Sequence, residues 1–169
     1  MQYDHIVSEL SRNKNVFRDL FSGLKEPQIR WSQAPGKWCL LEIICHLYDE
    51  EREDFRARVA HILNDATKEM PKIDPVAWVT ERKYIEQNYD EMTAKFVAER
   101  EKSIEWLQSL QNPDWQLFYR HPKVGPVSAE LIFTNWLAHD YLHVRQITRL
   151  KYDYLKAHTA VPLDYAGEW

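Results

Sequence analysis

Glycine and cysteine are both scarce in this sequence. Only 4 of its 169 residues are glycine, and this scarcity disfavours an all-β fold rich in tight turns. The 2 cysteines, Cys39 and Cys45, are six residues apart within one predicted helix, so they lie on different faces and are not expected to form a disulfide. Because disulfides are typical of oxidising compartments, we expect a reduced, cytoplasmic protein.

The sequence also lacks an excess of positive charge and a long apolar run. Its formal net charge is -4 and its isoelectric point is about 6.0, so it has no basic excess of the kind that nucleic-acid binding requires. No apolar run is long enough to cross a bilayer, and residues 1–5 lack the layout of a signal peptide. We therefore expect neither a nucleic acid nor a membrane as a partner.

The residues that are present fit a globular protein with a hydrophobic core. Apolar residues make up 44% and charged residues 28% of the chain, and its length suits a single domain over residues 1–169. The 7 tryptophans and 9 tyrosines are more than a core of this size needs. Some of them are expected to line a cleft or an interface.

Apolar residues recur at three- and four-residue spacing in four long segments, which predicts an all-α fold. We expect a four-helix bundle in which residues 64–79, interrupted by Pro71 and Pro75, form a long crossover connection. Ser128 and Pro126 mark the start of the last helix, and Glu42 with Cys39 resembles a capping box at the start of the second. The predicted helices span residues 3–24, 39–63, 80–110 and 127–151, with loops at 26–37 and 111–126 and an aromatic tail at 152–169.

Two histidines of the last predicted helix, His139 and His143, are four residues apart. This spacing puts both side chains on one helix face about a turn apart, so both imidazoles can reach one metal ion. Trp136 and Ile147 share that face, which directs the pair toward the core. Histidines at this spacing also occur without a metal, as residues that form hydrogen bonds across a core.

A third candidate ligand, His46, lies on the second predicted helix between the core-facing residues Ile43 and Leu47. Three neutral imidazoles from two helices would hold a divalent ion and leave at least one coordination position open, as in catalytic sites. Zn, Ni and Fe all accept imidazole, so the ligand type does not choose among them. The alternative is that His46 is an ordinary core or surface histidine.

Several polar residues near these histidines are weaker candidates. Glu50 lies one turn beyond His46 and is the candidate catalytic general base, although the sequence favours a solvated carboxylate on the helix surface. Asp140 is expected to be a surface or capping charge because it points to another face than His139. Asn135 and Gln146 could contact a ligand, or simply be polar residues at the edge of the helix.

Three stretches of this sequence form a pattern: Trp31-x6-Trp38, Glu42-Ile43-Ile44-Cys45-His46-Leu47-x-Asp49-x-Glu51 and Trp136-x2-His139-Asp140-x2-His143-x2-Gln146-Ile147. Together these stretches resemble the DinB superfamily. The resemblance covers most of the chain and the order of its helices.

The resemblance implies a four-helix bundle with a long crossover, a divalent metal ion and often a homodimer. By motif position, the metal ligands are His46, His139 and His143. Characterised members include transferases and isomerases that use low-molecular-weight thiols such as bacillithiol or mycothiol. Cys39 departs from the family pattern, in which a serine or threonine caps the helix.

These observations favour a metal-dependent enzyme that acts on a small-molecule substrate, either by transferring a low-molecular-weight thiol to an electrophile or by hydrolysis. The alternative is a non-catalytic, dimeric binding module with a vestigial metal site or none. A purely structural metal is a third possibility, but it requires four protein ligands, and the sequence offers no convincing fourth.

Overall fold

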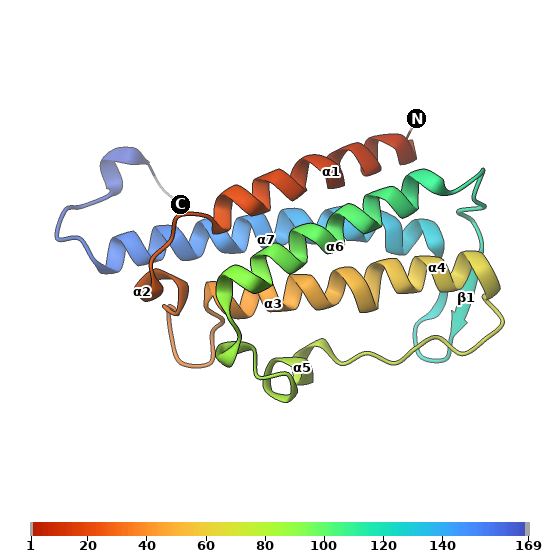
Figure 1. Ribbon diagram of the computed structural model, residues 1–169, viewed down its shortest axis with the longest axis horizontal. Coiled ribbons are helices and arrows are strands. Elements are labelled where there is room, and N and C mark those ends of the chain that lie inside the picture. Colours follow the sequence, from red (N-terminus) through yellow and green to blue (C-terminus); the bar gives the residue numbers. More distant parts are fainter. Residues whose placement is uncertain (1, 168–169) are drawn as a thin grey trace.

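The computed structural model of this protein describes residues 2–167 and shows an elongated bundle of four long helical segments (Figure 1). The all-α prediction is confirmed, because 68% of the structure is helical. Short elements occupy the connections: the helices α2 (Glu26–Ile29) and α5 (Pro75–Glu81) and the 3-10 turns η2 (Tyr84–Glu86) and η3 (Asp164–Ala166). The long segments are α1 (Gln2–Phe21), the continuous run α3 (Leu40–Asp49), η1 (Glu50–Phe55) and α4 (Arg56–Asp65), then α6 (Tyr89–Ser109) and α7 (Ala129–Ala157).

The long crossover has a geometric cause. The second long segment and α6 pack against each other and run in the same direction in Figure 1. A short hairpin can join only antiparallel neighbours, so the chain after α4 must return along the whole bundle before α6 begins. The crossover is therefore confirmed, and it carries α5 and η2 on its way back.

The third helix was predicted to begin at residue 80, and this prediction was wrong. Residues 80–88 hold the end of α5, a left-handed Lys83 with φ of 50° and η2, so α6 begins only at Tyr89. Asn88 caps it by accepting a hydrogen bond from the backbone N–H of Glu91 at 2.9 Å. Apolar residues recur at helical spacing on both sides of this break, which is why periodicity alone predicted one helix.

The predicted loop at 111–126 contains a β-hairpin that sequence analysis missed. Strand β1 (Phe118–His121) pairs antiparallel with β2 (Gly125–Ser128), and Gly125 adopts a positive φ of 82° in the tight connection. The last helix also continues past the predicted end at residue 151 to Ala157. The helix begins at Ala129, two residues later than predicted, and Pro126 lies in β2. Ser128 caps the helix as predicted, since its hydroxyl accepts a hydrogen bond from the N–H of Leu131 at 3.0 Å.

Residues Glu50–Phe55 form a turn of π-helix inside the second long segment, where a regular α-helix was expected. Such single turns insert an extra residue and often occur at functional sites. The predicted capping box is present at the start of this segment, where the backbone N–H of Cys39 donates to the Glu42 carboxylate at 2.9 Å. Both cysteines are buried free thiols, as predicted.

A buried polar layer divides the hydrophobic core into two clusters. One cluster includes Phe17 and Phe96, and the other includes Leu10 and Trp136. Between them, each long segment contributes one buried polar residue to the layer. These four residues are Asn13, Glu51, Arg100 and Asp140. None of the helices that the structure describes is both long enough and apolar enough to cross a bilayer.

Candidate metal centre

Three histidine side chains converge beside the polar layer. The ring nitrogens of His46, His139 and His143 that could act as ligands all lie within 4.8 Å of one another. The Nε2 atoms of His139 and His143 are 3.0 Å apart, and the His46 ring centroid lies 5.4 Å and 5.0 Å from the centroids of the other two rings. The helix α7 thus supplies two imidazoles from successive turns, and α3 supplies the third from the facing helix.

Aromatic side chains hold the histidine rings in place. The Trp38 ring packs against His46 with centroids 4.9 Å apart, and the Phe55 ring packs against His139 at the same distance. Phe55 in turn stacks on Trp136 with an angle of 9° between the ring planes. Phe55 is the last residue of the π-helical turn, so that turn helps to position an aromatic ring against His139.

The site favours neutral imidazoles. Burial lowers the pKa of His46 to about 3 and that of His139 to about 2, with the neighbouring imidazoles adding to both shifts. Burial also lowers the pKa of His143. A neutral imidazole keeps a lone pair on one ring nitrogen, so all three residues are available as metal ligands at neutral pH.

The converging ring nitrogens fit a metal ion. The Nδ1 atom of His46 is buried and has no hydrogen-bond partner among the described residues, which is costly for a polar atom. A hydrogen bond between the Nε2 atoms of His139 and His143 satisfies those two atoms alone. Within residues 2–167 the cluster contains no fourth histidine, cysteine or carboxylate. Three nitrogen donors without a fourth suit a divalent ion with an open coordination position.

Glu50 is not the solvated carboxylate that the sequence favoured. It is buried, with 5% of its surface exposed, and its Oε1 has no hydrogen-bond partner in the described part of the chain. Burial raises its pKa to about 8, and the carboxylate of Asp54 one turn further on adds to the shift. Glu50 lies outside the histidine cluster and occupies the first position of the π-helical turn.

The prediction that Asp140 is a surface charge was also wrong. Its side chain is fully buried, and both carboxylate oxygens accept hydrogen bonds of 2.7 Å from the guanidinium of Arg100. Asn13 donates to the same carboxylate at 3.0 Å. Arg100 also donates to Glu51 at 2.8 Å, and the Trp136 indole N–H donates to the other Glu51 oxygen at 2.9 Å. This network joins all four long segments next to His139.

Sequence analysis missed Arg100 and Glu51 as members of this network. A signal for Arg100 exists, because it lies four residues from both Phe96 and Ile104 on the apolar face of its helix. A cation at such a position needs a buried carboxylate as partner. The identity of that partner depends on how the helices pack, and the sequence does not contain this information locally.

A surface hollow of about 630 Å³ opens beside His143. It lies between α7 and the loop that carries Gln33, and Arg145, Gln146 and Arg149 also line it. Gln146 is thus placed where it can contact a bound molecule. Asn135 is not part of this hollow, and its side-chain amide donates instead to the Leu131 carbonyl of its own helix at 2.8 Å.

Comparison with known proteins identifies the fold and the family. No curated protein sequence matches the chain. Among solved structures, YfiT from Bacillus subtilis, described as a probable metal-dependent hydrolase with an unusual four-helix bundle topology, superposes with a TM-score of 0.78. The two chains are 17% identical, and the match covers 88% of this chain and 85% of YfiT. The sequence model of the DinB superfamily matches residues 9–147, so this chain belongs to the DinB superfamily.

Proposed function

We propose that this protein is a divalent-metal-dependent enzyme that hydrolyses a small molecule, with His46, His139 and His143 as the metal ligands. The observation that carries the proposal is the cluster of three neutral imidazoles, of which His46 and His143 are buried and His139 is partly buried, without a fourth protein ligand among the described residues. The description of YfiT as a probable metal-dependent hydrolase supports the same reaction class.

The bound ion would supply positive charge that makes water a stronger nucleophile near neutral pH. The protein's own residues would do the remaining work. The three histidines hold the ion, and the hollow beside His143 admits a substrate whose polar groups can meet Gln146 and Arg145. Glu50, with its pKa near 8, is the candidate group that accepts or returns a proton one helical turn from His46.

A low-molecular-weight thiol could replace water as the nucleophile at the same site, and this remains the second candidate reaction. A thiolate is a good ligand for Zn and its relatives, and a metal lowers the pKa of a thiol as it does that of water. The two reactions are separated by product analysis with and without added thiol.

We also propose a cytoplasmic location and a homodimeric state.

The test begins with metal analysis of protein purified without a histidine tag after growth with Zn, Ni or Fe. We expect about one equivalent of metal in the wild type and a loss of at least tenfold in affinity for His143→Ala. His5→Ala, which removes an exposed histidine near the start of α1, is the matched control and should load normally. A wild-type protein that takes up no stoichiometric metal would contradict the proposal.

A panel of esters, amides and thiol-reactive electrophiles then tests the activity. Hydrolysis should follow the metal content of each preparation and disappear with His143→Ala. If loaded protein binds metal but turns over no substrate with either water or thiol, the non-catalytic binding module becomes the better description.

A further inference from the structure

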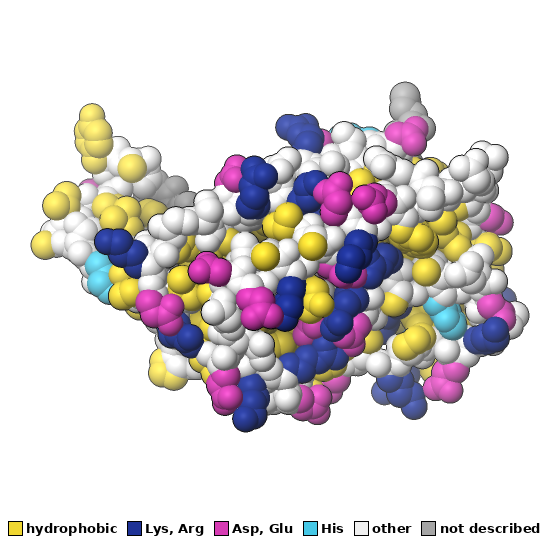
Figure 2. Space-filling view, viewed as in Figure 1, with side chains coloured by type: hydrophobic (Ala, Val, Ile, Leu, Met, Phe, Trp, Pro, Cys, Tyr) yellow, Lys and Arg dark blue, Asp and Glu magenta, His cyan; other side chains and the backbone are white. Residues whose placement is uncertain are grey.

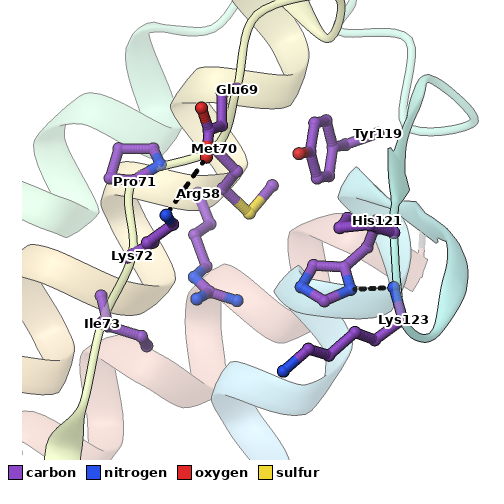
Figure 3. A pocket seen from close by; sticks show the side chains of 10 residues that line it. Arg58, Glu69, Met70, Pro71, Lys72, Ile73, Tyr119, His121 and Lys123 are labelled. Atoms are coloured by element: carbon purple, nitrogen blue, oxygen red, sulfur yellow. Dashed lines mark hydrogen bonds and ion pairs between the residues drawn. The ribbon is translucent and has the colours of Figure 1, made fainter.

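A second cavity lies between the start of the crossover and the β-hairpin (Figure 3). Its volume is about 340 Å³, within the range of small-molecule sites. It contains none of the three histidines of the candidate metal centre. Its lining residues are Arg58 from α4, Glu69, Met70, Pro71, Lys72 and Ile73 from the crossover, and Tyr119, His121, Pro122 and Lys123 from the hairpin.

Cationic side chains dominate the polar part of this cavity. Figure 3 shows the guanidinium of Arg58 at its centre, with the amines of Lys72 and Lys123 on either side. Only Glu69 supplies a carboxylate to the lining, and it lies 3.7 Å from the amine of Lys72. Arg58 pairs at 2.7 Å with Asp54, one turn earlier in the same long helical segment. The lining therefore carries more positive than negative charge.

Lys123 is the cation whose charge is least compensated. No carboxylate among residues 2–167 forms an ion pair with its amine, and the side chain is exposed at the mouth of the cavity. The backbone N–H of Lys123, a separate group, donates to the Nδ1 of His121 at 3.2 Å. An anion that entered the cavity would meet this amine without first displacing a protein carboxylate.

His121 adds a hydrogen-bond donor to the same cavity. Its Nδ1 accepts hydrogen bonds from the backbone N–H groups of Lys123 and Val124, at 3.2 Å and 3.3 Å. A neutral imidazole that accepts at Nδ1 carries its proton on Nε2, so the Nε2–H is available to a ligand. Figure 3 shows this edge of the ring turned toward Arg58.

The rest of the lining is apolar. Met70, Pro71, Ile73 and Pro122 provide aliphatic surface, and the Tyr119 ring forms one wall. Apolar walls around a few convergent polar groups are typical of sites for organic molecules rather than for bare inorganic ions.

We propose that this cavity binds a small organic anion, with an apolar body against Met70 and Tyr119 and a carboxylate or phosphate group between Arg58 and Lys123. A guanidinium and an ammonium on opposite sides of one oxyanion form charge-assisted hydrogen bonds, which are the strongest kind in proteins. The cavity is separate from the histidine cluster, so this proposal is independent of the proposed function.

The test measures binding to the full chain by isothermal titration calorimetry and by amide shifts in NMR spectra. The probes are benzoate, phenyl phosphate and the neutral analogue benzyl alcohol. We expect at least one anion to bind with a dissociation constant of about 1 mM or below, to shift the amides of the hairpin, and to bind about tenfold more tightly than benzyl alcohol. The tighter of the two anions identifies the acidic group that the site prefers.

Two variants and a control locate the site. Lys123→Gln should weaken anion binding about tenfold, and Arg58→Gln by at least as much. Arg58→Gln could fail to fold because Asp54 would lose its partner. Lys123→Gln would then still test the proposal, because the Lys123 side chain is exposed and its replacement does not disturb the core. Lys156→Gln, an exposed lysine at the far end of α7, should leave binding unchanged.

Three results would overturn the proposal. They are no saturable binding of either anion, equal binding of benzoate and benzyl alcohol, and an equal loss of binding in Lys123→Gln and Lys156→Gln. The last result would mean that the probes respond to the general charge of the surface.

Discussion

Glu50 is a carboxyl group that burial removes from water. Its neighbour Asp54 pairs with Arg58, whereas Glu50 Oε1 lacks a hydrogen-bond partner in the described part of the chain. Burial therefore holds its pKa near 8, against an ordinary value of 4.5. Natural sequences retain such a costly residue where a proton must be held or released, which is consistent with the catalytic role that we propose.

This shift predicts a pH-dependent gain in stability for Glu50→Gln in metal-free protein. Between pH 4.5 and about 8 the folded state holds one more proton than the unfolded state, so wild-type stability falls as the pH rises. The glutamine carries no titratable proton and avoids this loss. We expect the variant to gain about 1–3 kcal/mol over the wild type at pH 8.5 and much less at pH 5. Urea unfolding at both pH values measures the difference, and an equal effect at both would contradict it.

Asp140 and Arg100 show the opposite situation, in which buried charges are fully paired. Removing the charge in Asp140→Asn leaves the guanidinium with only Glu51 as an ionic partner. We expect a loss of about 3 kcal/mol in the free energy of unfolding.

The matched control is Asp153→Asn, which breaks an ion pair with Arg149 on the exposed part of the same helix. That pair should contribute at most about 1 kcal/mol. If the two variants lost the same amount of stability, the buried network would not hold the helices together as we infer.

At the scale of elements, α7 carries two of the three candidate ligands, and its position depends on both its start and its middle. Ser128 caps the first turn, and the Asp140 network fixes the helix half-way along. The π-helical turn in the facing segment brings Phe55 against His139. The candidate metal centre is therefore built by contacts between elements as much as by the histidines.

The cap yields a prediction for Ser128→Ala. The N–H of Leu131 would lose its acceptor, and we expect the protein to lose about 1 kcal/mol of stability. Ser8→Ala replaces an exposed serine inside α1 and should be neutral or slightly stabilising, because alanine has the higher helix propensity. Thermal unfolding of the two variants side by side checks the prediction, and it fails if Ser8→Ala is the more destabilised.

At the scale of the whole molecule, the C-terminal segment extends away from the bundle (Figure 1). Apolar residues after α7 are strongly exposed, with Val161 at 68% and Tyr165 fully exposed. Figure 2 shows hydrophobic side chains gathered over this end, while charged groups cover the face of the bundle in this view. Exposed apolar residues of this kind are often covered by a partner.

We therefore expect that removal of residues 159–169 weakens self-association. Sedimentation equilibrium should show a dimer for the full chain and a larger monomer fraction for the truncated chain at the same concentration. Full-length Lys156→Gln serves as the control for a change in surface charge. A full chain that is monomeric, or a truncated chain that dimerises equally well, would contradict the predicted homodimer.

Local pattern alone determined much of this protein. Apolar periodicity predicted the four long helical segments, and capping residues such as Ser128 predicted a helix start that the structure confirms. The spacing of His139 and His143 predicted that these two rings would share a helix face, and the resemblance to the DinB superfamily implied that His46 would meet them, as it does. The helices, the cap and the histidine pair depend on residues within a turn or two of one another, so a single sequence contains them.

Only the tertiary structure decided the burial of Glu50 and Asp140, the π-helical turn, the break before α6 and the cavity at the hairpin. Each depends on residues far apart in the chain: Asp140 is buried because Arg100, 40 residues away, lies opposite it. A polar residue on a helix has the same local pattern whether it faces water or a buried partner. Which of the two it faces is determined by how the helices pack, because the free energy of burying a charge depends on the partner it meets there.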